Sequence, residues 1–191
     1  MRRLVLAIAT ALVPLLWGGA ALAYEPISAE NLALIEQCGA TVTRRQEPTF
    51  SGQLYGALFS PDMEGNQRYS RGIGVLIGVS KYADASGFVA LPGVRKDVAT
   101  MQNLLISPDG SDLGYDIVIS LTDENVTGAN VACLVQNALP TLIDKELDRL
   151  LFYWAGHGVD NGQKRGYLPF YDTPLARLND FTALPMMDLQ E

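Results

Sequence analysis

The sequence predicts an α/β fold, a three-layer α/β/α sandwich in which a mostly parallel β-sheet lies between two layers of helices. Three apolar runs carry this prediction, over residues 73–79, 115–121 and 150–154. The first run is typical of a strand that is buried on both faces, the second is predicted to be a strand, and the third is predicted to be another buried strand. Two segments with helical spacing separate the runs, and this alternation of strand and helix favours right-handed crossovers between parallel strands.

The two intervening segments are predicted to be helices that cover the sheet. The first spans residues 94–106, and the second follows Thr127, whose hydroxyl can cap the first helical turn. The apolar stripe of the first helix consists of Val94, Val98, Met101 and Leu105, and that of the second of Val131, Leu134, Val135, Ala138, Leu139 and Leu142. Functional groups of such sheets gather where strands end, which here means residues 80–97 and His157.

The first 23 residues are typical of a signal peptide. Two arginines precede an apolar stretch over residues 4–17, and Ala21-Leu22-Ala23 is a small-x-small cleavage site. A membrane anchor is the alternative, although the apolar stretch is short and is interrupted by proline and glycine. The expected localisation is therefore export, to a bacterial periplasm or beyond, without a stable membrane anchor after cleavage.

Residues 24–70 are interpreted as a leader or pro-region before the main domain. Within them Ser28 can cap a short helix that Gly39 ends. Residues 40–70 show little periodicity and are predicted to be mostly loop. The apolar pattern of the sheet begins after Arg71, so the domain itself is expected over residues 71–191.

The composition narrows the possible partners. The formal charge is −7, and removal of the first 23 residues leaves 12 basic and 21 acidic residues, a charge of −9. This balance argues against a nucleic-acid partner and against docking on an anionic membrane, because both need a basic face. With one histidine and two cysteines, the chain offers none of the common zinc patterns, and no cofactor is expected.

Two familiar motifs nearly match and fail. Residues 72–74 begin like a dinucleotide-binding fingerprint, but Ile77 stands at its third glycine, and the glycines open the strand instead of following it. Residues 78–82 resemble a nucleophile elbow, but Tyr82 replaces the glycine that the sharp turn requires. Neither motif therefore predicts a site.

His157 is the residue that points most directly to chemistry. It follows the third apolar run and lies between Gly156 and Gly158, which leave the backbone open to a substrate. The Gly158 amide could stabilise a developing oxyanion, while an imidazole here can take a proton from a thiol and return it to a leaving amine. The alternative is a histidine that makes only local hydrogen bonds in a tight turn.

An ordered set of segments resembles the large-subunit (p20-type) half of the caspase superfamily, peptidase family C14, and especially bacterial metacaspases, also called orthocaspases. The segments are Arg71-Gly72 leading into VLIGVSKY, then LPGVRKDV, GYDIVISLTDENVT, DRLLFYWAGHG and GYLPFYD. The resemblance covers roughly residues 71–191. It implies a caspase-like sheet and a cysteine endopeptidase that cleaves peptides or proteins, and some metacaspases also need calcium. The loop acids Asp109, Asp112, Asp123 and Glu124 are better interpreted here as solvated charges than as a calcium loop.

The resemblance also implies roles for individual residues. His157 matches the catalytic histidine, and Gly158 matches the glycine whose amide helps to form the oxyanion hole. Asp97 matches the aspartate that lines the P1 pocket of metacaspases, although a carboxylate at a helix start also suits the helix dipole. Leu91 stands where caspases carry the arginine that binds an acidic P1 side chain. Two further departures from the metacaspase pattern are Val94, in place of a cysteine, and Ala155, in place of a serine.

The catalytic cysteine of the family has no match in residues 1–191. In the superfamily it follows the next core strand, about 50 residues after the histidine. Residues 181–191 are predicted to start a helix, so the sheet is expected to be incomplete at its C-terminus. Cys38 is expected in the leader, outside the core, and Cys133 on a helix flank, so that neither reaches His157.

The expected function is therefore a caspase-like cysteine endopeptidase with His157 as general base and acid, whose cysteine this chain does not supply. A catalytically dead binding or regulatory module is the alternative. The natural substrate, the mode of activation and the oligomeric state stay open.

Overall fold

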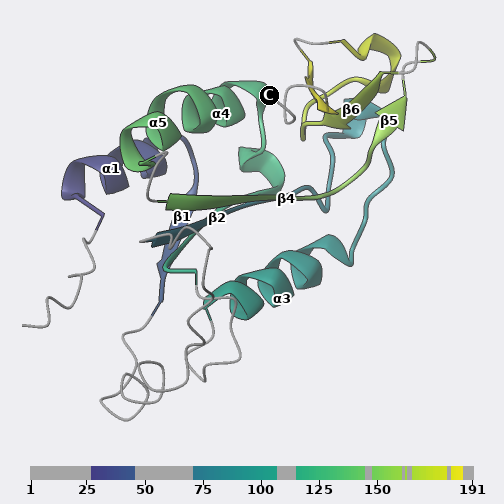
Figure 1. Ribbon diagram of the computed structural model, residues 1–191. Helices are drawn as coiled ribbons and strands as arrows, with labels where there is room; N and C mark the ends of the chain where they lie inside the picture. The colour runs from purple at the N-terminus through teal and green to yellow at the C-terminus, as the bar shows by residue number, and fades with distance from the viewer. Residues whose placement is uncertain are drawn as a thin grey trace, which may run out of the picture.

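The structure is a computed structural model that describes residues 27–45, 71–106, 115–144, 148–160, 162, 165–179 and 182–186. The expected signal peptide lies outside the described residues, as does most of the expected leader. Figure 1 shows a central sheet with α1, α4 and α5 on one face and α3 on the other. The predicted three-layer α/β fold is confirmed. Among the described residues, no helix has both the length and the apolar character that crossing a membrane requires.

The central sheet has four strands in the order β1-β3-β2-β4. Its strands are β1 (Thr41–Arg44), β2 (Arg71–Gly78), β3 (Ile117–Thr122) and β4 (Asp148–Ala155). The strand β2 runs parallel to both β3 and β4, as the apolar runs predict, whereas β1 pairs with β3 in the antiparallel direction. A second, antiparallel sheet consists of β5 (Val159–Asp160), β6 (Gly166–Pro169) and β7 (Ala183–Pro185).

The glycines of β2 let α3 (Val94–Ile106) lie close to the sheet. A Cβ atom on Gly74 would come within 2.7 Å of Leu105 Cδ1, and one on Gly78 within 2.5 Å of Val98 Cγ2. Because larger side chains at these positions would push the helix away, the glycines set the separation between α3 and the sheet. Val98 and Leu105 are both buried in the resulting core layer.

The opposite face is covered by α1 (Ala29–Gln37) and by a long helix in three parts, α4 (Gly128–Ala132), a π-helical segment (Cys133–Ala138) and α5 (Leu139–Leu142). The predicted caps are confirmed, since the hydroxyls of Ser28 and Thr127 accept hydrogen bonds from the amides of Asn31 and Asn130. Pro140 follows the π-helical segment, and its ring would clash with the preceding turn of a regular α-helix. The wider turn before it accommodates that proline.

The amino ends of β2 and β4 are joined by a partly buried ion pair. Arg71 donates from Nε to Asp148 Oδ1 at 3.2 Å and from Nη2 to Asp148 Oδ2 at 2.5 Å. Arg71 Nη2 also donates to the carbonyl of Leu142 at 2.5 Å, and the Asp144 amide donates to Asp148 at 2.9 Å. This bidentate pairing fixes the edge of the sheet that lies opposite the carboxyl ends of the strands.

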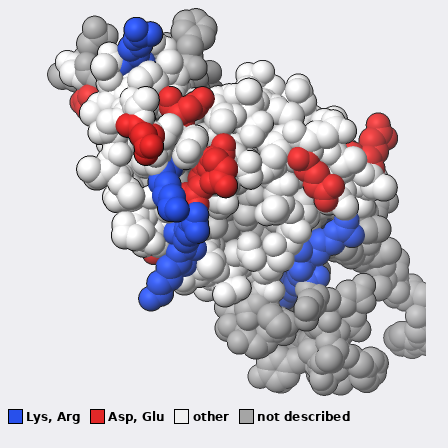
Figure 2. Space-filling model, turned by 180° about the vertical axis from the view of Figure 1, so that it is seen from behind, with Lys and Arg blue, Asp and Glu red and all other residues white. Residues whose placement is uncertain are grey.

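The surface carries charges of both signs. Figure 2 shows the rear of the molecule, where acidic and basic side chains lie interspersed among uncharged ones. In that view the main strips of basic side chains lie directly beside acidic ones.

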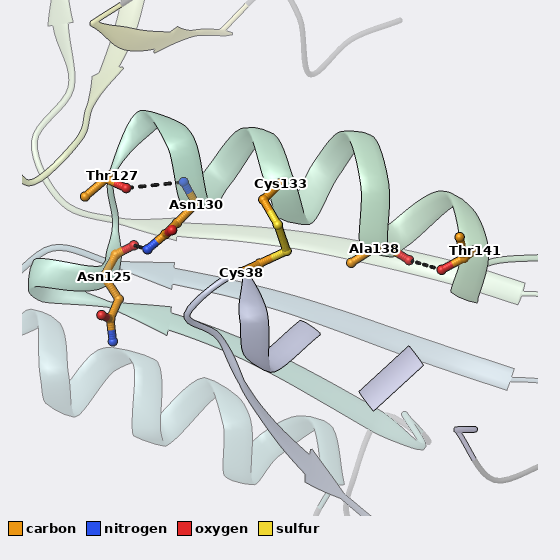
Figure 3. Close-up of a disulfide and its surroundings, with 7 residues drawn as sticks. All are labelled: Cys38, Asn125, Thr127, Asn130, Cys133, Ala138 and Thr141. Carbon is orange, nitrogen blue, oxygen red and sulfur yellow. Dashed lines mark hydrogen bonds between the residues drawn. A yellow bond between two sulfur atoms is a disulfide. The ribbon is translucent and has the colours of Figure 1, made fainter. Parts of the chain in front are cut away.

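The segment before Arg71 contributes to the same sheet and core, which corrects two expectations. Cys38 is fully buried and forms a disulfide with Cys133, with 5.4 Å between their Cα atoms, so it does not lie outside the core. Figure 3 shows this disulfide joining the end of α1 to the helix above the sheet. Residues 41–44, expected to be loop, form β1. Four residues are too few to show a strand period, and the antiparallel pairing with β3 supplies what the local sequence lacks.

Residues 183–185 also differ from the expectation. They were predicted to begin a helix, but they form β7, which pairs with β6. Pro185 gives the physical reason, because a proline pushes the residue before it, here Leu184, into extended backbone. Ala183 is buried at this point, and the Thr173 hydroxyl donates to the Thr182 carbonyl and accepts from the Phe170 amide.

Replacing Cys38 by serine should lower the free energy of unfolding by about 2–5 kcal/mol, because the disulfide closes a long loop of the unfolded chain. The two cysteines are separated by 95 positions in the sequence. Urea unfolding of the two proteins with and without reductant measures the effect. Reductant should destabilise the natural chain and leave the Cys38→Ser variant unchanged. Equal midpoints for both proteins without reductant would contradict this assignment.

Candidate active site

Three loops begin at one edge of the central sheet. Gly78, the last residue of β2, is in register with Thr122 at the end of β3 and with Ala155 at the end of β4. The loop after β2 spans residues 79–93 and is called here the β2–α3 loop. Because the strands are parallel and end together, this loop, the turn at Asp123 and the segment with His157 all start at the same edge.

His157 is held by two hydrogen bonds from the β2–α3 loop. Its backbone amide donates to the Tyr82 hydroxyl at 2.9 Å, and its ring atom Nε2 lies 2.9 Å from the Val89 carbonyl oxygen. A carbonyl can only accept, so this contact assigns the ring hydrogen to Nε2. In the neutral imidazole the other nitrogen, Nδ1, then carries the lone pair that can accept a proton.

Two aromatic rings pack against the imidazole. The centroids of the Tyr82 and Phe88 rings each lie 5.3 Å from the centroid of the His157 ring, and 5.0 Å from each other. Burial raises the pKa of the Tyr82 phenol, and the hydrogen bond from the His157 amide offsets only part of that rise. The phenol therefore stays protonated at neutral pH and acts as a fixed neutral acceptor for the His157 backbone.

The two glycines beside His157 have different surroundings. A Cβ atom on Gly156 would lie 3.0 Å from Trp154 Nε1 and 3.1 Å from the Tyr82 hydroxyl oxygen, so only glycine fits without moving them. A Cβ atom on Gly158 would meet no heavy atom within 4 Å. The backbone at Gly158 is thus open on that side, which agrees with the access that the sequence predicts. Trp154 Nε1 itself is buried and lacks a hydrogen-bond partner.

Asp97 lies in the first turn of α3 with its side chain exposed. The same turn packs against the carboxyl edge of the sheet, because Val94 and Val98 contact the position of Gly78, which is in register with Ala155. Asp97 and His157 are therefore at the same end of the sheet, but no hydrogen bond joins them. Leu91 is half-buried, and its amide donates to the Ser80 carbonyl at 2.8 Å.

Asp123 corrects an expectation, since it is not a solvated loop charge. Asp123 is 4% exposed, and its carboxylate accepts hydrogen bonds from Ser80, Lys81 and Arg95. Burial by itself would raise the pKa of this carboxyl, but the hydrogen bonds from the Ser80 hydroxyl and amide, the Arg95 guanidinium and the Lys81 amide outweigh burial and lower it. The side chain is therefore an anion at neutral pH.

The chain holds no free thiol. Its two cysteines form the Cys38–Cys133 disulfide, so neither is a thiolate. Over the described parts of the chain, no group of histidine, cysteine and acidic side chains is arranged to hold a metal ion.

The sequence indicates His157 as a candidate, but it does not indicate the residues that hold His157 in place. Val89 contributes a backbone atom, which residue identity does not reveal, and Phe88 lies in a loop without periodicity. In the sequence, Tyr82 stands out only because it replaces the last glycine of a nucleophile-elbow motif. The available signal was the pair of aromatic residues in a polar loop that follows a buried strand.

The comparison with protein families gives one clear result. The family model described as the caspase domain, of peptidase family C14, matches residues 71–189. No curated protein and no solved structure matched the chain. By resemblance, the family match implies a cysteine peptidase whose substrates are peptides or proteins. Because the match covers more than half of the sequence, and because the sheet carries His157 at its carboxyl edge, the chain belongs to the caspase domain family.

Proposed function

We propose that this chain carries the catalytic histidine of a caspase-like cysteine endopeptidase, with His157 as general base and then general acid. The observation that carries the proposal is the 2.9 Å contact between His157 Nε2 and the Val89 carbonyl. It commits the ring hydrogen to one nitrogen and leaves Nδ1 available for proton transfer. The match to the caspase domain supports the same role.

The proposed reaction is acyl transfer through a thioester. A cysteine from outside residues 1–191 gives its proton to His157 Nδ1, and the thiolate attacks the carbonyl carbon of the scissile peptide bond. The oxyanion that forms accepts a hydrogen bond from the Gly158 amide. The imidazolium returns its proton to the leaving amine as the C–N bond breaks. Water then hydrolyses the thioester to the carboxylic acid and regenerates the thiol.

The hydrogen bond to Val89 serves both protonation states of His157. Nε2 carries a hydrogen in the neutral ring and in the imidazolium, so the bond does not have to rearrange when Nδ1 takes up a proton. Tyr82 and Phe88 pack against the ring and restrict its rotation. A ring that is already oriented before the proton moves needs less reorganisation in the transition state.

One observation favours a second candidate, a caspase-like binding or regulatory module without catalysis. Both cysteines are joined in a disulfide, so residues 1–191 contain no thiol that could attack a peptide. The two candidates differ in whether a cysteine from outside this sequence meets His157.

Purified residues 24–191 should show no peptidase activity, because His157 alone could only activate water, which attacks amides far less readily than a thiolate. Extension of the chain by the sequence encoded after Glu191 should supply the cysteine and give activity. In the extended protein His157→Ala should lower kcat/KM by about 10²–10⁴-fold or more.

The exposed α3 variant Leu104→Ala serves as the matched control and should retain activity. If the extended protein carries a cysteine, is folded and still cleaves no peptide, the result favours the binding or regulatory module over the peptidase.

The extended enzyme should cleave after arginine or lysine and poorly after aspartate. The exposed Asp97 carboxylate offers a partner for a basic P1 side chain, and Leu91 offers no cation for an acidic one. A library of P1 residues measures this preference. Asp97→Asn should lower kcat/KM for P1 arginine by roughly 10–100-fold, the equivalent of one charged hydrogen-bonded pair. Preference for P1 aspartate, or an unchanged arginine preference in Asp97→Asn, would contradict the assignment of Asp97 to the P1 pocket.

We also propose that the chain is exported and cleaved after Ala23. The disulfide supports an oxidising compartment, where such bonds form and persist. N-terminal sequencing of the exported protein should begin at Tyr24. Recovery from the cytosol of a chain that still begins at Met1 would contradict the proposal.

A further inference from the structure

No hydrogen bond joins Asp123 to His157, yet Asp123 binds the base of the loop that holds His157. We propose that Asp123 is a positioning residue for His157 and acts through the β2–α3 loop. The inference deepens the proposed function and rests on it for its catalytic consequence. The geometry that it concerns can be measured without any peptidase activity.

The Asp123 carboxylate joins three elements of the fold. Its Oδ1 accepts from the Ser80 hydroxyl at 2.6 Å, from the Ser80 amide at 2.8 Å and from the Lys81 amide at 3.2 Å. Its Oδ2 accepts from Arg95 Nε at 2.8 Å and pairs with Arg95 Nη2 at 2.6 Å. Asp123 follows β3, Ser80 and Lys81 begin the β2–α3 loop, and Arg95 lies in the first turn of α3. One side chain thus ties together the ends of two strands and the start of a helix.

The backbone at Asp123 is itself unusual. Its φ of +48° is the only positive value of a non-glycine residue over the described parts of the chain. Aspartate and asparagine tolerate this left-handed region better than most residues. The turn is closed by a hydrogen bond of 2.8 Å from the Val126 amide to the Asp123 carbonyl. Such strain persists where surrounding contacts hold it, and here the carboxylate provides them.

The far end of the β2–α3 loop binds Ser80, the residue that Asp123 holds at the start of the loop. The Leu91 amide donates to the Ser80 carbonyl at 2.8 Å, so both ends of the loop meet at Ser80. Between these ends lie both supports of His157. Tyr82 follows directly after Lys81, and Val89 stands two residues before Leu91. A shift at the base of the loop therefore moves the hydroxyl and the carbonyl that orient His157.

A second connection runs from the loop back to the Asp123 turn. The Ala83 amide donates to the Tyr171 carbonyl at 2.9 Å, and the Tyr171 amide donates to the Val126 carbonyl at 2.8 Å. Within the loop, the Ser86 amide donates to the Ala83 carbonyl at 2.8 Å. The loop is thus fixed at its base and at its middle, and both attachments lead to the residues around Asp123.

Asparagine at this position keeps the shape and tolerates the positive φ, but it cannot keep all of the hydrogen bonds. An amide side chain has one acceptor oxygen and one donor nitrogen, whereas the carboxylate accepts on both oxygens. If the oxygen faces the Ser80 and Lys81 amides, the nitrogen faces the donors of Arg95. The substitution therefore loosens the base of the loop with little change in volume.

The chain contains a single histidine, so the ring nitrogens of His157 can be observed without competing signals. The test is ¹⁵N NMR of the full, disulfide-bonded chain at a pH where the ring is neutral. The natural chain should show one tautomer, with hydrogen on Nε2 and widely separated nitrogen shifts. Asp123→Asn should narrow that separation, because a displaced Val89 carbonyl no longer selects one tautomer.

Asp148→Asn is the matched control. It breaks the ion pair between Arg71 and Asp148, which lies at the end of β2 opposite the β2–α3 loop. It should lower stability and leave the His157 shifts unchanged. If Asp123→Asn does not fold, Ser80→Ala removes the 2.6 Å bond while keeping the backbone amides, and it should narrow the separation to a smaller degree. Shifts in a folded Asp123 or Ser80 variant that match the natural chain, or equal changes in Asp148→Asn, would overturn the proposal.

Peptide cleavage is a separate measurement, so its failure does not affect this result. In an extended, active protein Asp123→Asn should lower kcat more than it changes KM, because the ring loses its orientation while the peptide site persists.

Discussion

The parallel register of β2 with its two neighbours is the constraint on which the rest of the structure depends. Gly78 is in register with both Thr122 and Ala155, so three strands end at one level. The loops that follow them carry Ser80, Asp123 and His157, residues that are far apart in the sequence. A shift of one residue in either pairing would separate these groups and reverse which side chains face α3. The placement of these three residues at one edge of the sheet is thus a consequence of backbone pairing.

The sequence predicts the elements whose signal is local. Apolar runs identify β2, β3 and β4, and helical spacing identifies α3 and the helix after Thr127. The prediction that the third run is a buried strand is wrong, because β4 lies at the edge of the described sheet and its residues 149–154 are half-buried or exposed. His157 is recognisable because it follows an apolar run and lies between two glycines. Its supports are not, since Tyr82 and Val89 lie 75 and 68 positions away from it, and Ser80 lies 43 positions from Asp123. Patterns within a short window carry no information about such contacts.

The elements that prediction missed are those stabilised by distant partners. The strand β1 has four residues and exists through its pairing with β3, and β7 has three residues and exists through its pairing with β6. Two cysteines permit a disulfide, but only the fold shows that α1 brings Cys38 beside Cys133. Asp123 shows the same limit for charge, because an acid in a loop is solvated or buried according to what packs around it.

The disulfide has a consequence for any cleavage of the chain before the domain. A backbone break between Arg45 and Arg71 would leave two polypeptides that are held together by the Cys38–Cys133 bond and by the pairing of β1 with β3. Such a nicked protein would migrate as one species on a gel without reductant and as two species with it. Cutting the amino-terminal segment and releasing it are therefore separate events, and release depends on the redox state of the surroundings.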